Sequence, residues 1–367
     1  MRLSNFIPIK RLGKGGYGTV ILAKQISKNS LVAIKIMKIS DIVRKNAIDK
    51  VQVEQKIFKQ LSESHLNLIV DDFMVHFCGS FKTKTHLFLV LDYCQNGDLS
   101  DLLDQSGSFG ERWSAWLIAE IALGLSVLHR CGIIYNDLKP ENCLMSDDGH
   151  VKFTDFGISQ FTLKQQIAQS RAMSRIQSQS RSQSFSKDQV YTDQVERPEK
   201  ILGTPCYLAP ELFQGQSPSF KSDFWALGVC LFEFVFGVKP FQCENLEELF
   251  DQISFSEVKF PVDQQVSPML KDLIEALLKK DPGKRLCKID DLKAHPFFKE
   301  QNVQFDNIFK RKPPYIPVKQ KLEFKLQHNE DWEEFLDNET KEECSSFEGM
   351  DFHYTNANIP RLFTLDE

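Results

Sequence analysis

Hydrophobic residues change their spacing along the chain after about the first hundred positions. Before that point, short apolar runs alternate with polar turns, and these runs predict β-strands at 7–9, 20–22, 31–36 and twice within 73–93. One helix is expected among them, from Asp41 to Leu61, because its apolar residues recur three or four positions apart and share one face. The early part of the chain therefore indicates a small antiparallel β lobe with one helix.

Beyond Gly97 the helical spacing dominates. It predicts helices over roughly 99–105, 112–131, 222–237, 245–253 and 267–279. The longest apolar run, Phe224 to Phe236, is shorter than the roughly 20 residues of a membrane span and indicates a helix buried in a large core. A strand-rich start followed by a helix-rich remainder predicts an α+β fold in two lobes, with the boundary at residues 95–97.

Composition narrows the classes of function. The chain has 367 residues, 42% hydrophobic and 26% charged, which suits one large two-lobed domain with a tail or two ordinary domains. A net charge of −5 gives no support for a nucleic-acid surface or an anionic-membrane anchor, because both favour basic patches. The nine cysteines lack Cys-x-x-Cys spacing, and the start lacks both an apolar signal core and a myristoylation glycine. These features predict reduced thiols and a cytoplasmic location, with the nucleus as the alternative.

Two segments depart from the pattern of strands and helices. Residues 165–187 contain six Gln and seven Ser with three Arg and no acid, so they lack the apolar surface that would offset their ordering entropy. We expect this insert to be disordered. Residues 299–367 are polar, punctuated by proline and isolated aromatic residues, and are expected to form a tail that lies on the domain.

A glycine cluster occupies the first predicted turn, and it reads Gly13-Lys14-Gly15-Gly16-Tyr17-Gly18-Thr19-Val20. Glycines let backbone amides approach phosphates closely, but an ordinary hairpin turn or a dinucleotide site would use the same residues. A dinucleotide motif leads from a strand into a helix, whereas β-branched residues follow here, as in a hairpin. Seventeen residues after Gly18 a strand reaches Lys35. Lys35 is the natural partner of Glu54, a carboxylate on the apolar face of the expected helix that needs a cation to offset its desolvation.

Four polar residues carry the chemistry. Residues 133–142 read Ile-Ile-Tyr-Asn-Asp-Leu-Lys-Pro-Glu-Asn, and Asp155-Phe156-Gly157 begins thirteen residues beyond Asn142. Phosphoryl transfer needs a carboxylate that accepts the proton of a hydroxyl, a lysine that steadies the moving group, and oxygen ligands for magnesium. A polar loop beside a turn would explain each residue alone, but their joint spacing favours the catalytic interpretation. The four residues are Asp137, Lys139, Asn142 and Asp155.

These motifs together resemble the eukaryotic protein kinases from Phe6 to Phe298. The resemblance implies a bilobal fold with a small lobe at 6–94, a large lobe at 95–298 and an activation-segment insert at about 162–198. It implies ATP and Mg²⁺ as substrate and cofactor, with Asp137 as the base, Lys139 and Asn142 beside it, and Asn142 and Asp155 as metal ligands. The residues implied at the ATP site are Leu12, Gly13, Lys14, Gly15, Gly16, Gly18, Val20, Ala33, Lys35, Glu54, Leu91 and Leu144.

The same resemblance implies further roles. Glu211 with Arg285 is similar to the buried structural ion pair of the family, and Asp223 to the residue that braces the catalytic loop. Thr204, together with Lys139, is typical of serine/threonine rather than tyrosine kinases, so the implied partners are proteins with a serine or threonine acceptor. Residues implied in substrate recognition are Asp98, Glu141, Thr204, Leu208 and Glu233. Among them Asp98, Glu141 and Glu233 stand where related kinases receive basic residues on the N-terminal side of the acceptor.

Motifs in the second half narrow the resemblance to the AGC group, the kinases related to the cyclic-AMP-dependent enzyme. They are Tyr135, the run from Gly203 to Glu211, residues 312–317, the segment from Trp332 to Phe335, and a hydrophobic motif at 347–352 in which Met350 replaces the usual phenylalanine. The group implies a monomer whose tail, 299–367, docks in cis on the small lobe.

Two other classes remain as alternatives. A calcium/calmodulin-group kinase would carry a basic amphipathic helix after the domain, whereas residues 330–343 are strongly acidic. A pseudokinase scaffold would have lost Lys35, Asp137 or Asp155, and all three are present.

Three positions depart from the AGC pattern together. Asn136 replaces the arginine before Asp137, Lys200 replaces the phosphorylated threonine that this arginine would bind, and Asp351 replaces the acceptor of the hydrophobic motif. An amide that faces a lysine cannot form a phosphate–arginine pair. We therefore expect an enzyme that needs neither phosphate; the alternative is that Thr192 or Tyr191 takes over.

The insert offers a regulatory hypothesis of its own. It places arginine three residues before Ser174, Ser178 and Ser184, which is a spacing that AGC kinases commonly favour in their substrates. Phosphorylation of these serines by this kinase and chance matches in a low-complexity segment explain the pattern equally well.

Overall fold

The computed structural model describes residues 1–16, 18–63, 67–162, 205–317, 332, 335–336 and 352–355. Contacts divide the chain into two compact units: unit 1 (Met1–Asp98, Leu144–Gly157, Tyr315–Glu367) and unit 2 (Leu99–Cys143, Ile158–Pro314). The first boundary lies four residues beyond the predicted limit of the small lobe at 94. Residues 144–157 group with unit 1 rather than with the predicted large lobe; among their contacts with it, the Val75 amide donates to the Phe153 carbonyl and the Met145 amide to the Gly97 carbonyl, both at 2.9 Å.

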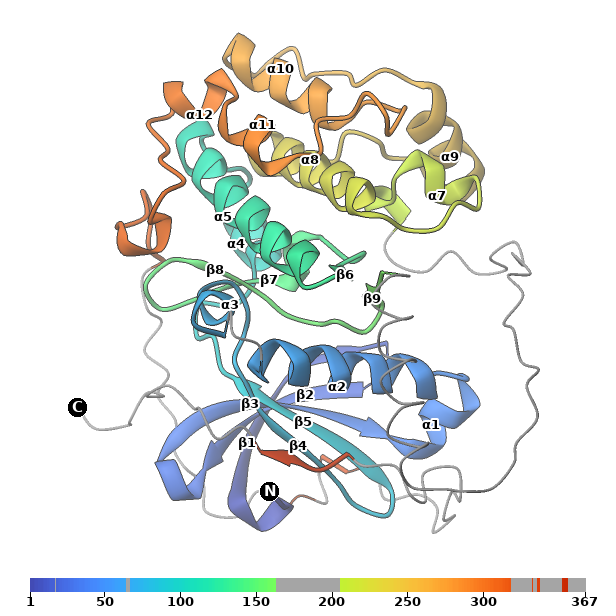
Figure 1. The fold of residues 1–367 in the computed structure, drawn as a ribbon, viewed down its shortest axis with the longest axis vertical. Coiled ribbons are helices and arrows are strands. Elements are labelled where there is room, and N and C mark those ends of the chain that lie inside the picture. The colour runs from blue at the N-terminus through green and yellow to red at the C-terminus, as the bar shows by residue number, and fades with distance from the viewer. Residues whose placement is uncertain are drawn as a thin grey trace, which may run out of the picture. The chain divides into compact units, whose positions relative to one another are not determined.

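Unit 1 is built on a six-stranded antiparallel sheet (Figure 1). Its strands are β1 (Phe6–Gly15), β2 (Gly18–Gln25), β3 (Ser30–Lys38), β4 (Phe77–Lys82), β5 (His86–Asp92) and β10 (Tyr354–Thr355), in the order β1-β2-β3-β5-β4-β10. The first predicted strand extends to Gly15, because the hairpin continues through the glycine cluster until Gly15 pairs with Gly18. Inward-facing aliphatic and aromatic residues of these strands form the core, among them Ile21, Val32, Phe81, Phe88 and Val90.

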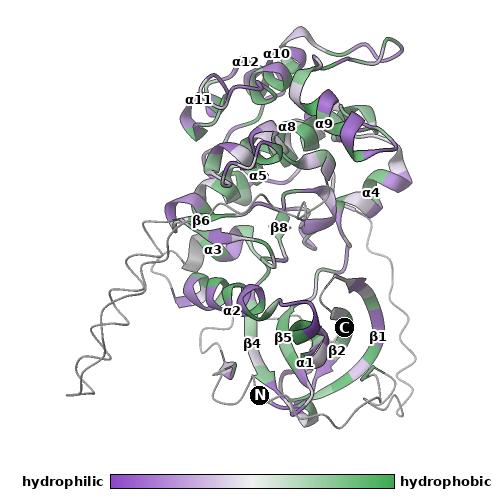
Figure 2. Cartoon of the chain, turned by 90° about the vertical axis from the view of Figure 1, so that its right-hand side faces the viewer, coloured by the Kyte–Doolittle hydropathy of each residue, from purple (hydrophilic) through white to green (hydrophobic). Residues whose placement is uncertain are grey.

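Three helices accompany the sheet: α1 (Ile39–Arg44), α2 (Ile48–Glu63) and α3 (Asn67–Phe73). The single helix predicted from Asp41 to Leu61 is in fact two helices, since Asn46 adopts a left-handed conformation (φ 49°) that ends the first. Sequence analysis did not predict α3, which displaces the start of the next strand from Phe73 to Phe77. The α2 ribbon is banded purple and green in Figure 2, as expected for a helix with one apolar face.

Short elements complete unit 1. Two 3₁₀ turns, η1 (Leu3–Asn5) and η2 (Ile26–Lys28), flank the β1–β2 hairpin, and β7 (Cys143–Met145) pairs with β8 (Val151–Phe153).

Residues from the C-terminal region also lie on unit 1. Trp332, Phe335 and Leu336 pack against the core of the sheet, and Trp332 meets Phe88 edge-on with ring centres 6.3 Å apart. Phe352 is fully buried, and β10 adds to the edge strand β4. Of the predicted tail, residues 299–317, 332, 335–336 and 352–355 are described, and the remainder, including hydrophobic-motif positions 347–351, lies outside the described residues.

Unit 2 is helical. Its helices are α4 (Leu99–Ser106), α5 (Glu111–Arg130), α7 (Pro210–Phe213), α8 (Phe220–Phe236), α9 (Leu246–Phe255), α10 (Pro268–Leu277), α11 (Ile289–Lys293) and α12 (Pro296–Glu300). The 3₁₀ turns are η3 (Pro140–Asn142), η4 (Pro205–Tyr207) and η5 (Ile308–Lys310), and β6 (Ile133–Ile134) pairs with β9 (Gln160–Phe161). The five helices predicted in this region are present, and the α+β prediction is confirmed.

Helix α8 forms the centre of unit 2 and packs against both α5 and α10. Every residue of α8 from Ser222 to Phe236 is buried, so the apolar run belongs to a core, as its length predicted. Among the described residues, no helix combines the length and hydrophobicity needed to cross a membrane. The described cysteines are all free thiols.

Candidate functional site

The predicted partner of Glu54 is in place within unit 1. The Lys35 Nζ lies 2.7 Å from Glu54 Oε1 and 3.1 Å from Asp155 Oδ1. β3 supplies the lysine and α2 the glutamate, while Asp155 follows β8. The Asp155 backbone is left-handed (φ 55°), and its carboxylate also accepts the amide of Gly157 at 3.0 Å. The Asp155 side chain is 42% exposed, whereas that of Glu54 is 2% exposed. The Asp155 carboxylate is therefore accessible to solvent, whereas the Glu54 carboxylate is buried.

Burial and charge act against each other in this group. Burial alone would lower the pKa of Lys35, but the charges of Asp155 and Glu54 and their hydrogen bonds outweigh it, so the pKa is raised above its ordinary value. Burial raises the pKa of Glu54 to about 7, and the nearby Lys35 opposes that rise. The lysine thus stays cationic at every physiological pH, while the Glu54 carboxyl takes up a proton near neutrality.

The glycine cluster serves two different purposes. A Cβ on Gly18 would lie 2.2 Å from the Ile36 carbonyl oxygen, so glycine is required there for strand packing. A Cβ on Gly13 or Gly16 would meet nothing within 4 Å. The protein itself therefore does not require glycine at those two positions, and the open space fits a loop that leaves room for phosphates. Lys45, the residue directly after α1, contacts the loop, since its Nζ donates to the Gly16 carbonyl at 2.6 Å.

The strands bring the predicted nucleotide-binding side chains into register. Val20 pairs with Lys35, and Ala33 pairs with both Leu22 and Leu91 across β2, β3 and β5. Leu144 forms an isolated bridge with Asp98. The predicted ATP-site residues all belong to unit 1, and so does the predicted metal ligand Asp155.

The predicted base and its neighbours belong to unit 2. Lys139 Nζ lies 3.0 and 3.1 Å from the two carboxylate oxygens of Asp137. The Asn142 amide nitrogen donates to the backbone carbonyl and to Oδ2 of Asp137, both at 2.8 Å. Asn142 thus fixes the carboxylate through its amide hydrogens, while its amide oxygen is the atom that suits a metal ion.

Asp223, at the start of α8, braces this loop as predicted. Its Oδ2 accepts the amide of Tyr135 at 3.0 Å and faces His129 Nε2 at 2.7 Å, while Oδ1 accepts the amide of Asn136 at 2.8 Å. Asn136 has φ 63°, a left-handed conformation that asparagine tolerates better than most residues. Its side-chain nitrogen donates to the Ile158 carbonyl at 3.3 Å. Asn136 therefore connects the catalytic loop to the segment before β9 without any phosphate.

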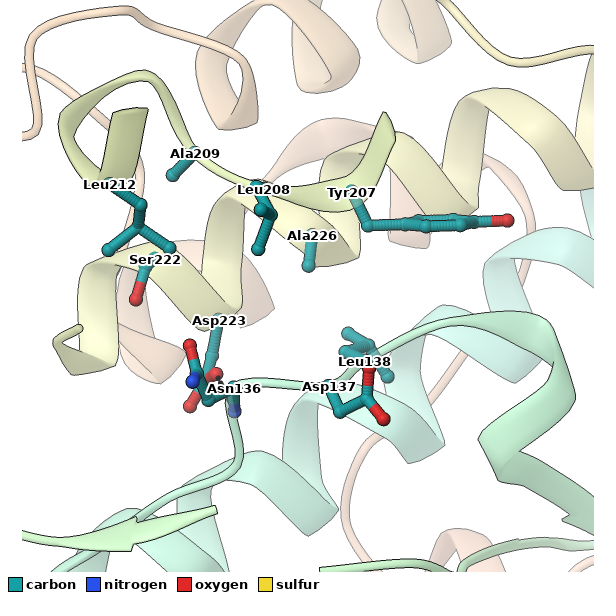
Figure 3. A pocket seen from close by; sticks show the side chains of 10 residues that line it. All are labelled: Asn136, Asp137, Leu138, Tyr207, Leu208, Ala209, Leu212, Ser222, Asp223 and Ala226. Carbon is teal, nitrogen blue, oxygen red and sulfur yellow. Dashed lines mark hydrogen bonds between the residues drawn. The ribbon is translucent and has the colours of Figure 1, made fainter. Parts of the chain in front are cut away.

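A pocket in unit 2 adjoins the predicted base (Figure 3). Asn136, Asp137 and Leu138 form one wall, and residues 207–212 with α8 form the opposite one. Most of the second wall is apolar: Leu208, Ala209, Leu212 and Ala226. The pocket therefore offers an apolar recess next to a carboxylate, and it includes Leu208, which was predicted to contact substrate.

Other predicted residues have separate surroundings. Glu211 and Arg285 form a buried two-bond pair, at 2.7 and 2.8 Å, as expected for a structural element. Glu233 is buried and is bound by Tyr207 and Lys239. Thr204, Lys200, Asp351 and the serines of the insert lie outside the described residues.

Sequence reasoning missed three participants. Lys45 and Tyr207 contact predicted site residues 29 and 26 positions away in sequence, and Lys239 contacts Glu233 from beyond the end of α8. Lys45 follows Arg44, and Lys239 lies between Val238 and Pro240, and nothing in either local pattern predicts the partner of the lysine.

Most of the chain is similar to known protein kinases. The model of the protein kinase domain matches residues 6–298. A probable serine/threonine protein kinase of Arabidopsis thaliana, IREH1, is 33% identical over 321 residues, covering 86% of this chain and 24% of that protein. Protein kinase C delta type of Rattus norvegicus is 33% identical over 316 residues, covering 86% and 41%. Flippase kinase 1 of Saccharomyces cerevisiae is 32% identical over 319 residues, covering 86% and 34%. The chain thus spans less than half the length of each of these three relatives.

Proposed function

We propose a function from one premise: the chain belongs to the protein kinase family, because the protein kinase domain matches residues 6–298. The function is transfer of the γ-phosphate of ATP to serine or threonine residues of proteins. The observation that carries it is the Asp137 carboxylate, held by Lys139 and Asn142 beside an apolar recess. Two relatives from Arabidopsis thaliana are named as probable serine/threonine protein kinases, and one from Saccharomyces cerevisiae is named as a kinase. These names support the same reaction class.

Each residue then has a defined task. Asp137 accepts the proton of the substrate hydroxyl, and Lys139 places a positive charge beside that carboxylate. Lys35, kept cationic by Glu54 and Asp155, binds phosphate oxygens. Magnesium supplies charge neutralisation on the phosphates, and the Asn142 amide oxygen and the exposed Asp155 carboxylate are the oxygen ligands that would hold it.

Phosphorylation of serine- and threonine-containing peptides with labelled ATP and magnesium tests this function. Asp137→Asn should lower kcat by about 10²–10⁴-fold, the usual contribution of a general base. Lys35→Met should weaken binding of a fluorescent ATP analogue, which separates nucleotide binding from catalysis. Lys299→Met, an exposed lysine in the last turn of α12, serves as the control and should keep wild-type values. Equal activity in the wild type and Asp137→Asn contradicts the proposal.

We also propose the finer assignments that the AGC motifs support: membership of that group, a preference for basic residues before the acceptor, and a cytoplasmic monomer whose tail docks in cis. The burial of Phe352 and the pairing of β10 with β4 support cis docking. The Asn136 bond to the Ile158 carbonyl supports activity without an activation-segment phosphate. Protein made in bacteria should keep its kinase activity after phosphatase treatment. Loss of that activity on dephosphorylation would exclude activity without an activation-segment phosphate.

A further inference from the structure

Glu233 uses both of its carboxylate oxygens inside its own chain. Oε1 lies 3.0 Å from the Nζ of Lys239, and Oε2 accepts the hydroxyl of Tyr207. The Glu233 side chain is 8% exposed. A cation arriving from outside would therefore find this carboxylate already paired, in a site with little access to water.

The end of α8 brings the lysine into position. Gly237 ends the helix in a left-handed conformation (φ 71°), and a Cβ there would lie 2.0 Å from the Gly107 carbonyl oxygen, so the chain reverses sharply at this glycine. Two residues later Lys239 lies against the last turn of the helix that it has just left. Its Nζ is also 5.5 Å from the centre of the Tyr207 ring, within cation–π range.

The electrostatic surroundings hold the lysine charge in place. Burial would lower the pKa of Lys239, but the hydrogen bond to Glu233 and the charge of Glu233 outweigh it, and the pKa is raised. Glu141 adds to that rise. The pKa of Tyr207 is raised mainly by burial, and Glu141 is a smaller cause of that rise, so a second carboxylate acts on the same place. The Lys239 side chain is 25% exposed, which leaves a route by which another cation could compete.

This charged group lies next to the recess beside the base. Tyr207, whose hydroxyl binds Glu233, lines the same pocket as Asp137 and Leu208 (Figure 3). An extended peptide advances about 3.3 Å per residue. A serine held at Asp137 therefore places the side chains of its near neighbours within reach of Tyr207 and of the carboxylate behind it.

We propose that Lys239 is a specificity-determining residue, which fills with the chain's own ammonium group the position on Glu233 where a basic substrate side chain would otherwise bind. The inference rests on the proposed function and refines its substrate preference. A substrate arginine that displaced Lys239 would form an ion pair with Glu233 but would break the existing pair between Lys239 and Glu233. Such an exchange adds little net affinity for the substrate. Substrates need no basic residue at that subsite, whatever Asp98 and Glu141 contribute elsewhere.

An arginine walk tests the proposal. Peptides with one serine acceptor carry arginine or alanine at each of the five preceding positions in turn, and kcat/KM is measured with wild-type enzyme, Lys239→Met, Lys239→Arg and Lys299→Met. Lys239→Met should raise the arginine-to-alanine ratio by about tenfold at one or two positions, the usual worth of a hydrogen bond to a charged group. Lys239→Arg and the exposed control Lys299→Met should keep the wild-type ratios. In Lys239→Met, the higher kcat/KM for the arginine peptides should come from a lower KM rather than from a higher kcat.

A variant of Glu233 tests whether its carboxylate is the group that binds the substrate arginine. In the Lys239→Met background, Glu233→Gln should abolish the new preference. Unchanged ratios in Lys239→Met overturn the proposal. The proposal is also overturned if the wild-type enzyme already prefers arginine at such a position and Glu233→Gln removes that preference. This comparison does not depend on whether the Lys239 variants fold. Phosphorylation of the peptide set separates the two levels: its absence for every peptide and every enzyme contradicts the proposed kinase function, whereas phosphorylation with flat ratios contradicts only the role of Lys239.

Discussion

Single residues in this protein take their meaning from the charges that surround them. Lys35 is the clearest case, because two carboxylates share its ammonium group and only one of them, Asp155, reaches solvent. A sequence pattern identified Lys35 and Glu54 as partners, since an isolated carboxylate on an apolar helix face needs a cation. The part that Asp155 plays in the same group depends on a contact across 120 positions of sequence.

The Glu54 carboxyl should make nucleotide binding depend on pH. Its pKa is raised by burial to about 7, so it ionises as pH rises through neutrality and takes up a proton as pH falls. We expect the KM for ATP to rise in the wild type when pH falls from about 8 to about 6, because the protonated carboxyl no longer fixes Lys35.

Glu54→Gln supplies the control for this titration. The variant should have a high KM at every pH, so the ratio of its KM to that of the wild type should approach one at low pH. The ratio also cancels the titration of ATP itself. A ratio that stays constant between these pH values contradicts the assignment.

Elements fit together through a few positions that tolerate no extra atoms. In α8, a Cβ on Gly228 would lie 2.7 Å from Leu277 Cβ and 3.0 Å from Leu278. The glycine thus allows α8 and α10 to approach closely, although glycine is unfavourable within a helix. The hydrophobic pattern predicted both helices but not their separation.

Gly228→Ala should therefore destabilise unit 2, by about 1–3 kcal/mol, as overpacking of a core does. Helix propensity acts in the opposite direction, so a stabilised variant would show that α10 gives way. Gly110→Ala, at the N-cap of α5 where a Cβ meets nothing within 4 Å, is the control for loss of a glycine without overpacking, and it should cost less than about 1 kcal/mol. Urea unfolding of both variants measures the difference.

The edge of the sheet in unit 1 is closed by a strand from the C-terminal region. The Phe352 carbonyl accepts the Ser80 hydroxyl at 2.8 Å, and Tyr354 stacks on Phe77 with ring centres 5.4 Å apart. Gly79 is needed here, because a Cβ would lie 2.3 Å from the Tyr354 carbonyl oxygen. Pairing of β10 with β4 thus covers an edge that would otherwise be open.

Phe352→Ala should detach this strand, because burial of the ring is its main anchor. We expect hydrogen exchange in residues 77–82 to become at least about tenfold faster, as for a locally opened segment. Tyr354→Phe, which removes only the hydroxyl that lies 3.1 Å from Ser62, should leave exchange near the wild-type rate. Unchanged exchange in Phe352→Ala would mean that the strand is held elsewhere.

At the scale of the whole molecule, the two units divide the chemistry. Residues predicted to bind the nucleotide belong to unit 1, whereas the proposed base and its two supporting side chains belong to unit 2. Each half therefore depends on the stability of its own core. Unit 2 is tied together by the buried Arg285–Glu211 pair, with the guanidinium 5.1 Å from the centre of the Trp225 ring.

Arg285→Met should lower the free energy of unfolding by about 3–5 kcal/mol, because it leaves the Glu211 carboxylate buried and unpaired. Tryptophan fluorescence in urea reports on this unit, since Trp113, Trp116 and Trp225 all belong to it. The double variant Glu211→Leu/Arg285→Met should recover part of the loss. A double variant no more stable than the single one would show that lost packing, rather than the unpaired charge, sets the cost.

The sequence alone predicted the arrangement of the proposed catalytic loop, because its residues are neighbours in the chain. Asp137, Lys139 and Asn142 fall within six positions, and short-range backbone geometry is enough to bring their side chains together. The alternating and helical hydrophobic patterns likewise determined the α+β class and most elements. Asn136 could be read as a departure from a motif, but its left-handed backbone and its bond to Ile158 came from the fold.

The tertiary structure alone decided which other charged and polar groups meet. Lys239 reaches Glu233 because a glycine reverses the chain after α8, and Tyr207 reaches the same carboxylate across 26 positions of sequence. Residues 352–355 lie along the edge strand β4 because the Phe352 ring is buried and the chain approaches Gly79 closely. Such contacts depend on how packed elements place their ends, and no local pattern of residues encodes that placement.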